Sequence, residues 1–133
     1  MIDTISVKTS NRTQFLDITS QLSGFVRESG VKDGVLLAYV PHTTAGITIN
    51  ENADPSVTRD ILMVLNRAVP VSNEYQHAEG NSDAHIKASL MGSSVTVIVS
   101  GGRLVLGTWQ GIYFCEFDGP RSRKVNLKLI SSE

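Results

Sequence analysis

The chain has 133 residues, of which 41% are hydrophobic and 19% are charged, and its formal net charge at pH 7 is −1. This length is that of one ordinary domain, and the composition is that of a globular protein. The nearly balanced charge gives no global attraction to nucleic acid or to an anionic membrane surface, so we expect neither as a partner. The predicted organisation is a single domain spanning residues 1–133.

The single cysteine, Cys115, excludes an intrachain disulfide. It falls among aromatic residues in a predicted strand, where a buried and inert thiol is expected. The first residues contain no basic stretch followed by a long apolar run, so no secretory signal is visible. The apolar stretches are far shorter than the roughly 20 residues that span a bilayer. We therefore expect a cytoplasmic protein.

The first predicted elements are two strands and a helix. Apolar residues alternate over residues 2–8, which is typical of a strand. Residues 12–17 are expected to return beside it as the second arm of a hairpin. The apolar spacing from Ile18 to Val26 then predicts a helix that ends at Gly30.

The middle of the chain predicts another pair of strands and the clearest helix. Residues 34–41 are an apolar run typical of a buried strand, and residues 46–50 are expected to pair with it. Asp54 is a good N-cap for the helix that follows, and Pro70 ends it. The residues expected to form its buried stripe are Val57, Ile61, Val64, Leu65 and Ala68.

The second half begins with a polar loop and a short helix. The loop covers residues 71–82, and Ser82 or Asp83 is expected to cap a helix that runs to Gly92. Four strands are then predicted at residues 94–99, 104–107, 112–117 and 124–130. Consecutive strands late in the chain indicate an α+β fold, with a mostly antiparallel sheet and about three helices.

The three histidines of the chain are the first candidates for a functional site. His42 follows the predicted buried strand and is flanked by small residues, which leave room for a ligand, while Thr43 and Thr44 add hydroxyl groups. On one straight helix, His77 and His85 would lie about 12 Å apart. At that distance they could not share a metal ion. The segment between them is predicted to be a loop, however, so the chain can fold back and bring the two histidines together.

Three neutral imidazoles with one open position are a known catalytic zinc arrangement, so His42, His77 and His85 are candidate ligands of a divalent metal. Such a metal lowers the pKa of a bound water to about 7 and generates a nucleophile. Zn²⁺ suits these ligands better than Mg²⁺, which prefers oxygen. The alternative is an anion pocket without a metal. A nearby carboxylate can complete the metal sphere, orient a histidine or act as a base, and the candidates are Glu51, Asp54, Glu79 and Asp83.

Two later segments add candidate ligand-binding residues. Trp109 and Gln110 fall at a turn between predicted strands, where Trp109 can stack on a planar ligand or fill a core or a subunit interface. Arg121, Arg123 and Lys124 form a basic cluster that can bind phosphate or carboxylate. The alternative for the cluster is an ordinary turn with salt bridges to Glu116 and Asp118.

In the motifs that contain these residues, the sequence resembles the YjbQ-like family of small proteins, sometimes labelled secondary thiamine-phosphate synthases. The resemblance covers nearly the whole chain. The matching stretches are His42-Thr43-Thr44-Ala45-Gly46, Asn50-Glu51-Asn52-Ala53-Asp54-Pro55, His77-Ala78-Glu79-Gly80-Asn81, Asp83-Ala84-His85-Ile86-Lys87-Ala88, Leu106-Gly107-Thr108-Trp109-Gln110 and Glu116-Phe117-Asp118-Gly119-Pro120-Arg121-Ser122-Arg123.

The resemblance implies a compact α+β fold, a homotrimer, and a polar pocket at or near a subunit interface. It implies a weak or secondary transferase activity that joins a pyrimidine diphosphate to a thiazole phosphate and expels pyrophosphate. The ligand would then be a small phosphorylated molecule. The alternative is a non-catalytic protein that binds a metal or a metabolite. The expected catalytic residues are His42, Glu51, His77 and His85, and the expected ligand-binding residues are Thr43, Thr44, Trp109, Gln110, Arg121 and Arg123.

Overall fold

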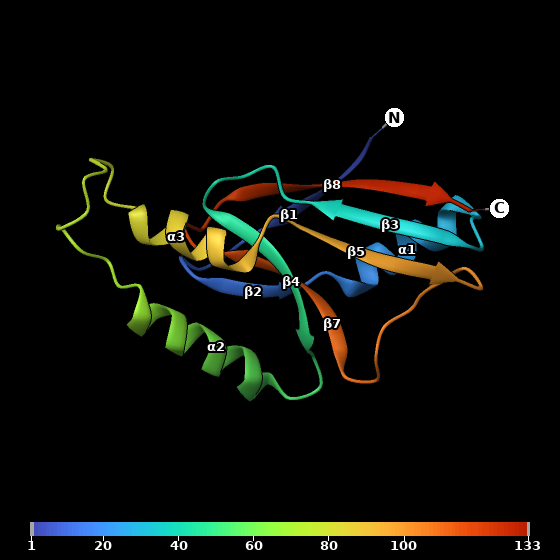
Figure 1. Cartoon of the computed structure of the whole chain (residues 1–133), viewed down its shortest axis with the longest axis horizontal. Coiled ribbons are helices and arrows are strands. Elements are labelled where there is room, and N and C mark those ends of the chain that lie inside the picture. The colour runs from blue at the N-terminus through green and yellow to red at the C-terminus, as the bar shows by residue number, and fades with distance from the viewer. Residues whose placement is uncertain (1, 133) are drawn as a thin grey trace.

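Two antiparallel sheets form the framework of the chain in a computed structural model that describes residues 2–132 (Figure 1). The strands are β1 (Asp3–Lys8), β2 (Gln14–Asp17), β3 (Gly34–Tyr39), β4 (Ala45–Glu51), β5 (Ser94–Ser100), β6 (Arg103–Leu104), β7 (Gln110–Glu116) and β8 (Ser122–Ser131). The larger sheet has the order β1-β8-β3-β5-β6, and the smaller sheet has the order β2-β7-β4. Three helices accompany the sheets: α1 (Thr19–Ser29), α2 (Pro55–Ala68) and α3 (Ser82–Met91). The prediction of an antiparallel α+β fold is therefore confirmed.

The main apolar core contains residues from both sheets and from α1. Leu36 and Leu127 come from the larger sheet, Ile47 and Phe114 from the smaller one, and Leu22 from α1, and all of them are almost fully buried. The helix begins beside Asp17, whose side chain accepts a hydrogen bond from the amide of Thr19 at 2.9 Å. Gly30 ends it with a φ of 76°, as the sequence predicts.

The two pairings predicted between consecutive strands in the first half of the chain are wrong, whereas the hairpin that Gly101-Gly102 indicates is present between β5 and β6. β1 pairs with β8, and β2 pairs with β7 in the other sheet, so they form no hairpin. The reason lies at buried Thr9, whose amide donates to the carbonyl of Arg121 at 2.9 Å and whose hydroxyl donates to Glu116 at 2.8 Å. These long-range bonds carry the chain from one sheet to the other. In the same way β3 pairs with β5 and β8, whereas β4 pairs with β7.

The clearest predicted helix, α2, is present, but its apolar stripe is only partly buried: Val57, Ile61 and Leu65 are half-buried, whereas Val64 and Ala68 are exposed. Asp54 caps it by accepting a hydrogen bond from the amide of Ser56 at 2.9 Å. None of its residues is buried, and Val64 is 57% exposed. The prediction of a buried stripe is therefore correct only in part, because α2 lies at the rim of the fold and packs on the core through residues such as Leu65 (Figure 1).

The remaining elements follow the sequence closely. The loop before α3 and the end of α3 at Gly92 are confirmed. The strand predicted at 104–107 is shorter than expected, because only Arg103 and Leu104 pair with β5. Cys115 is fully buried, and burial raises the pKa of its thiol far above its usual value. Within residues 2–132, no helix is long and apolar enough to cross a membrane.

Candidate functional site

A pocket of about 420 Å³ lies where the segment before β4 meets the turn between β7 and β8 and the loop before α3. It is lined by Pro41, His42, Thr43, Thr44, His77, Glu79, Asn81, His85, Asp118, Arg121 and Arg123. The structure therefore brings together all three histidines, both threonines and both arginines that the sequence singled out.

The floor of this pocket is a buried ion pair between the two sheets. Arg123 of β8 donates through Nε to Glu116 of β7 at 2.9 Å, and its Nη2 also bonds this carboxylate. The same Nη2 donates to the hydroxyl of Thr44 at 2.8 Å. Nη1 takes part in none of these bonds, so the ion pair leaves its two N–H donors uncommitted.

Glu116 is held in its charged form although it is fully buried. Burial disfavours the carboxylate, but hydrogen bonds from Arg123, Thr9 and the amide of Asp118, together with the charge of Arg123, hold the pKa of Glu116 below its usual value. Because each partner compensates the other, the pair keeps a charged guanidinium at the pocket without leaving an isolated buried charge.

A second, more exposed arginine lies at the rim. Arg121 donates through Nε to the carbonyl of Asp118 at 2.7 Å and through Nη2 to its carboxylate at 2.9 Å. These two bonds leave further donors of the guanidinium available. The salt bridges expected as an alternative, from the arginines to Glu116 and Asp118, are thus both present, and both arginines line the pocket nonetheless.

Asn81 adds a polar atom without a partner. Its Nδ2 donates to the carboxylate of Asp118 at 2.8 Å, which fixes the orientation of the amide. Its Oδ1 is buried and accepts no hydrogen bond within the described part of the chain. A buried carbonyl oxygen in this state costs about 1–3 kcal/mol, so it favours a ligand or water that donates an N–H or O–H group.

His42 is presented as a neutral imidazole. Its Nε2 accepts a hydrogen bond from the amide of Lys124 at 2.9 Å, so in the neutral ring the proton is on Nδ1. Burial and the positive charge of Arg123 hold the pKa of His42 below its ordinary value. The ring therefore offers one N–H donor, and a metal at Nε2 would have to displace the amide of Lys124.

His77 and His85 lie together, as the proposed fold-back of the loop requires. Their ring centroids are 5.3 Å apart in an edge-to-face arrangement. His85 is in the first turns of α3, whereas His77 is in the preceding loop, 3.8 Å from the carboxylate of Glu79.

Buried charges hold α3 in place beneath the histidines. Lys87 and Asp83, one turn apart, are both buried, and the ammonium of Lys87 is 3.5 Å from the carboxylate of Asp83. Arg12 reaches Asp83 at 3.1 Å and Asp118 at 3.4 Å. The other end of α3 lies against β4, where a Cβ on Gly46 would be 2.7 Å from the carbonyl oxygen of Gly92. These contacts explain why His85 faces the pocket.

The donor set is suited to a metal only in part. Two adjacent imidazoles and Glu79 are near one another, but among residues 2–132 no group of three or more His, Cys, Asp and Glu side chains is arranged to hold a metal ion. The geometry of this chain alone supports an anion pocket more directly than it supports a closed metal site. The metal remains a prediction.

Three predicted site residues lie elsewhere in this chain. Glu51 is at the opposite end of β4 from the pocket and pairs with Gln110. Trp109 lies in the turn just before β7 and is exposed. Seven residues of extended strand place Glu51 about 20 Å from the pocket end of β4. One chain therefore does not bring Glu51, Trp109 and Gln110 to the histidines.

Sequence reasoning did not assign Asn81, Glu116 and Asp118 to the pocket. Glu116 carried a usable signal, because it is an isolated carboxylate in an otherwise apolar and aromatic strand, and such a group must be paired when it is buried. For Asn81 the signal was its place in the matching stretch that begins at His77, because a Gly-Asn pair in a polar loop is by itself an ordinary turn.

The fold and the pocket define an α+β domain of two antiparallel sheets with histidines and arginines gathered at one end. The chain belongs to the UPF0047 protein YjbQ-like family, whose model matches residues 3–132.

Relatives match almost over their full length. UPF0047 protein MJ1081 of Methanocaldococcus jannaschii is 53% identical, with 100% of this chain and 96% of the relative covered. UPF0047 protein YugU of Bacillus subtilis is 52% identical, with 98% of this chain and 99% of the relative covered.

Solved structures share the fold. An uncharacterised conserved YjbQ/UPF0047 family protein from Clostridium acetobutylicum has a TM-score of 0.94 and 62% identity, with 96% of this chain and 99% of that chain covered. A YbjQ-like protein of unknown function from Sulfolobus solfataricus has a TM-score of 0.93 and 34% identity, with 99% and 97% covered. The predicted family and fold are therefore confirmed.

Proposed function

We propose that the chain is an enzyme that acts on a small phosphorylated molecule bound in the histidine pocket. The observation that carries this proposal is the buried Arg123, which is fixed by Glu116 and Thr44 and has Nη1 free of these bonds, in the same pocket as neutral His42. Arg121 offers a second guanidinium at the rim. Such donors bind phosphate oxygens and stabilise negative charge that develops on a leaving group.

The reaction that the family resemblance suggests is thiamine-phosphate synthesis. The ring nitrogen of the thiazole phosphate forms a bond to the methylene carbon of the pyrimidine diphosphate, while the carbon–oxygen bond breaks and pyrophosphate leaves with the electron pair. In this proposal, Arg121 and Arg123 stabilise the departing diphosphate. The Nδ1–H of His42 donates a hydrogen bond to one of its oxygens.

The test is thiamine-phosphate formation by the purified protein from the pyrimidine diphosphate and the thiazole phosphate. We expect turnover by the wild type, a loss of at least tenfold in kcat/KM for His42→Ala and Arg121→Gln, and no change for Arg59→Gln, an exposed arginine on α2. No turnover, or equal turnover by all four proteins, overturns the synthase assignment. Binding of both substrates without turnover favours the alternative, a non-catalytic protein that binds a metabolite.

We also propose that His77 and His85 contribute ligands to a divalent metal, with Zn²⁺ preferred to Mg²⁺. The contact between the two rings supports this, because imidazoles this close can bind one ion. Elemental analysis of protein purified without an affinity tag or chelator tests it. We expect about one zinc per chain in the wild type and a marked loss in His77→Ala. The absence of metal from the wild type contradicts the proposal and leaves an anion pocket.

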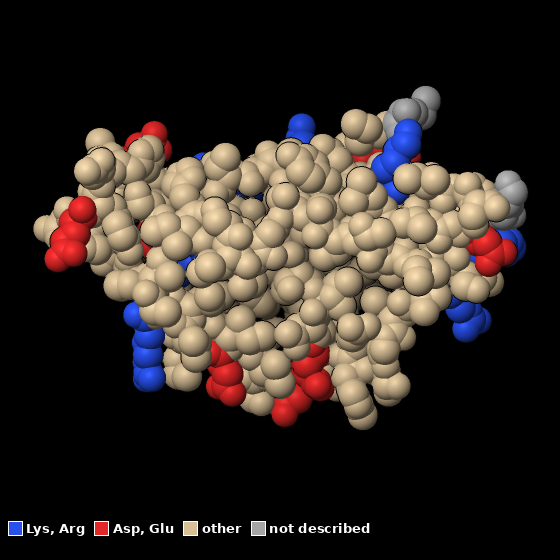
Figure 2. Space-filling view, in the orientation of Figure 1, with Lys and Arg blue, Asp and Glu red and all other residues tan. Residues whose placement is uncertain are grey.

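We propose, finally, that the chain assembles as a homotrimer. The proposal is supported by exposed apolar side chains on α3 and on the edge of the larger sheet, among them Leu90, Ile98 and Val105. Figure 2 shows a broad face over α3 and β5 from which charged residues are largely absent. Glu51, Trp109 and Gln110 would join the histidine pocket only if a neighbouring copy supplied them.

Sedimentation equilibrium of the wild type and of Ile98→Glu tests the assembly. The wild type is expected at three times the mass of the chain, and the variant at a lower mass. A monomeric wild type contradicts the trimer.

A further inference from the structure

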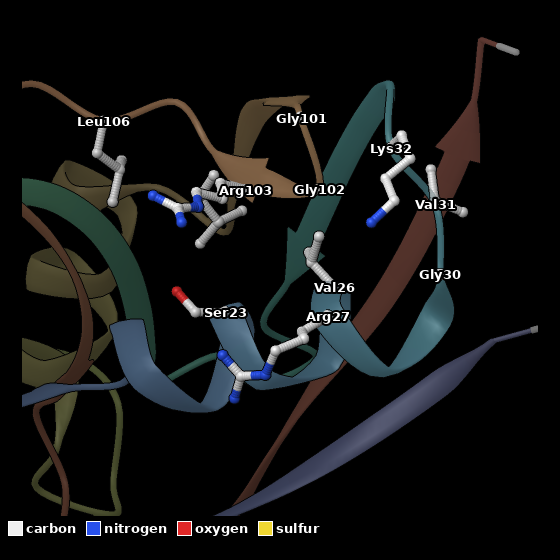
Figure 3. A pocket seen from close by; sticks show the side chains of 11 residues that line it. Ser23, Val26, Arg27, Gly30, Val31, Lys32, Gly101, Gly102, Arg103 and Leu106 are labelled. Carbon is white, nitrogen blue, oxygen red and sulfur yellow. The ribbon is translucent and has the colours of Figure 1, made fainter.

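A second pocket, of about 580 Å³, lies between the end of α1 and the β5–β6 hairpin (Figure 3). It shares no lining residue with the histidine pocket. Arg27, Lys32 and Arg103 line it, and no Asp or Glu does. Its volume is in the usual range of small-molecule sites, about 300–1,000 Å³. The side chains that line the pocket thus carry three positive charges and no negative one, although the net charge of the chain is −1.

The backbone around this pocket is held together across the chain. Gly101 and Gly102 form the turn of the hairpin with φ values of 60° and 74°, which favour glycine. The amide of Gly102 donates to the carbonyl of Lys32 at 2.9 Å, so the hairpin is tied to the segment after α1. Ser23 and Arg27 lie one helical turn apart on α1, and both line the cavity.

Two of the three basic side chains of the pocket, Arg27 and Arg103, have no acidic partner in the described part of the chain. Figure 3 shows the guanidinium of Arg103 and the hydroxyl of Ser23 on either side of one opening, with the amine of Lys32 toward its other end.

Each arginine has an ordinary explanation when it is considered alone. Arg27 is in the last turn of α1, where a positive charge complements the helix dipole. Arg103 is on the edge strand β6, where a charge discourages pairing with another sheet. Neither explanation accounts for the fact that both arginines line one cavity together with Lys32, where like charges repel.

We propose that this pocket binds a small molecule that carries a phosphate or diphosphate group. The phosphate oxygens would be held by Arg27, Lys32, Arg103 and the hydroxyl of Ser23, since guanidinium groups match this geometry. Leu104 and Leu106, which also line the cavity, give the remainder of the ligand an apolar surface. The site is distinct from the histidine pocket and does not depend on the function proposed for that pocket.

The experiment follows backbone amide signals by NMR while inorganic pyrophosphate is added at constant ionic strength. We expect saturable shifts at Gly30, Gly101 and Gly102, which report on the basic pocket, and we follow Gly80 and Asn81 as reporters of the histidine pocket. Arg27→Gln combined with Arg103→Gln is expected to weaken the shifts at the basic pocket at least tenfold. Arg59→Gln combined with Arg67→Gln, two exposed arginines on α2, is the control with the same change of net charge.

Three results would overturn the proposal: no saturable shift at Gly101 and Gly102, an unchanged affinity in the Arg27 and Arg103 variant, or an equal loss in the α2 control. The last result would mean that only the overall charge matters. Shifts confined to Gly80 and Asn81 would overturn this proposal while leaving the histidine pocket as a phosphate site. Shifts confined to the basic pocket would support it and count against the function proposed for the other.

Discussion

The Nε2 nitrogen of His42 accepts a hydrogen bond of 2.9 Å from the backbone amide of Lys124, the residue that follows the buried Arg123. This bond requires an unprotonated nitrogen, and it ties a neutral imidazole to β8. His42 and Arg123 therefore both reach the pocket beside this bond, and burial together with the charge of Arg123 lowers the pKa of His42.

The first prediction concerns the titration of His42. Its NMR midpoint is expected below the ordinary value of 6.5, because burial and Arg123 disfavour the imidazolium. The unfolded chain then binds this proton more readily than the folded chain. The contribution of His42 to the free energy of unfolding is therefore fully present above about pH 6.5. This contribution decreases as the pH falls toward the lower pKa that His42 has in the folded chain. His42→Gln should flatten this part of the profile, and a midpoint at or above 6.5 would contradict the prediction.

The second prediction concerns the buried carboxylate beneath the pocket. Glu116→Gln keeps the shape of the side chain but leaves the charge of Arg123 buried without its partner, so we expect a loss of about 3–5 kcal/mol in the free energy of unfolding. Urea denaturation at pH 7 measures it, and Glu28→Gln, an exposed residue of α1, should change it by less than about 0.5 kcal/mol.

The stability of the wild type and that of Glu116→Gln should also depend differently on pH in the acid range. Because the pKa of Glu116 is lowered in the folded state, its contribution is present above the ordinary value of 4.5 and is lost as the pH falls through the folded pKa. The difference between wild type and Glu116→Gln should therefore narrow below pH 4.5. A difference that stays constant down to the acid transition would show that Glu116 is not ionised in the native state.

The third prediction compares two glycines. Gly46→Ala places a methyl group 2.7 Å from the carbonyl oxygen of Gly92 and 3.1 Å from the Cβ of Met91, so α3 must move. We expect a loss of about 1–3 kcal/mol. In Gly24→Ala the nearest atom is the end of the Arg27 side chain at 3.7 Å, and the helix should gain about 0.4–1 kcal/mol. Equal effects at the two positions in thermal unfolding would contradict the close approach of α3 and β4.

The fourth prediction concerns the charges under α3. Lys87→Met removes the ammonium that donates to Asn66 at 2.8 Å and lies 3.5 Å from Asp83. Arg12 still compensates Asp83, so the expected loss is about 1–3 kcal/mol. Hydrogen exchange should accelerate most in α3, whereas Lys8→Met, an exposed residue on β1, should leave it unchanged. Uniform acceleration in every element would show that Lys87 has no particular role in holding α3.

The local elements of the fold could be predicted from the sequence, but most of the strand pairing could not, the β5–β6 hairpin at Gly101-Gly102 being the exception. Helix α1 depends on apolar spacing and on Gly30, and helix α2 on Asp54 and Pro55, which are signals that neighbouring residues carry. The assignment of β1 and β2 to different sheets depends instead on Thr9, whose partners are more than 100 residues away. A turn signal such as Ser10-Asn11 cannot reveal such partners.

In the candidate site, too, the features that depend on neighbouring residues could be predicted, whereas those that depend on the three-dimensional arrangement could not. His42, Thr43 and Thr44 were recognisable at a strand end, and the fold-back of His77 onto His85 followed from the loop between them. Glu51 lies at the far end of the strand that begins at the pocket, and strand length decided its position. The apolar stripe of α2 is only partly buried for another reason, since a periodic pattern shows that a face is apolar but not how much of it the rest of the chain covers.

The buried ion pair between Arg123 and Glu116 limits how the pocket can be redesigned. The guanidinium that a ligand would meet is the same group that links β8 to β7, so altering the floor to accept another ligand would loosen the attachment of one sheet to the other. Arg121, His77 and Glu79 are exposed at the rim and join no sheets. Specificity in this domain is therefore adjustable mainly from the rim, while the floor is shared with the architecture.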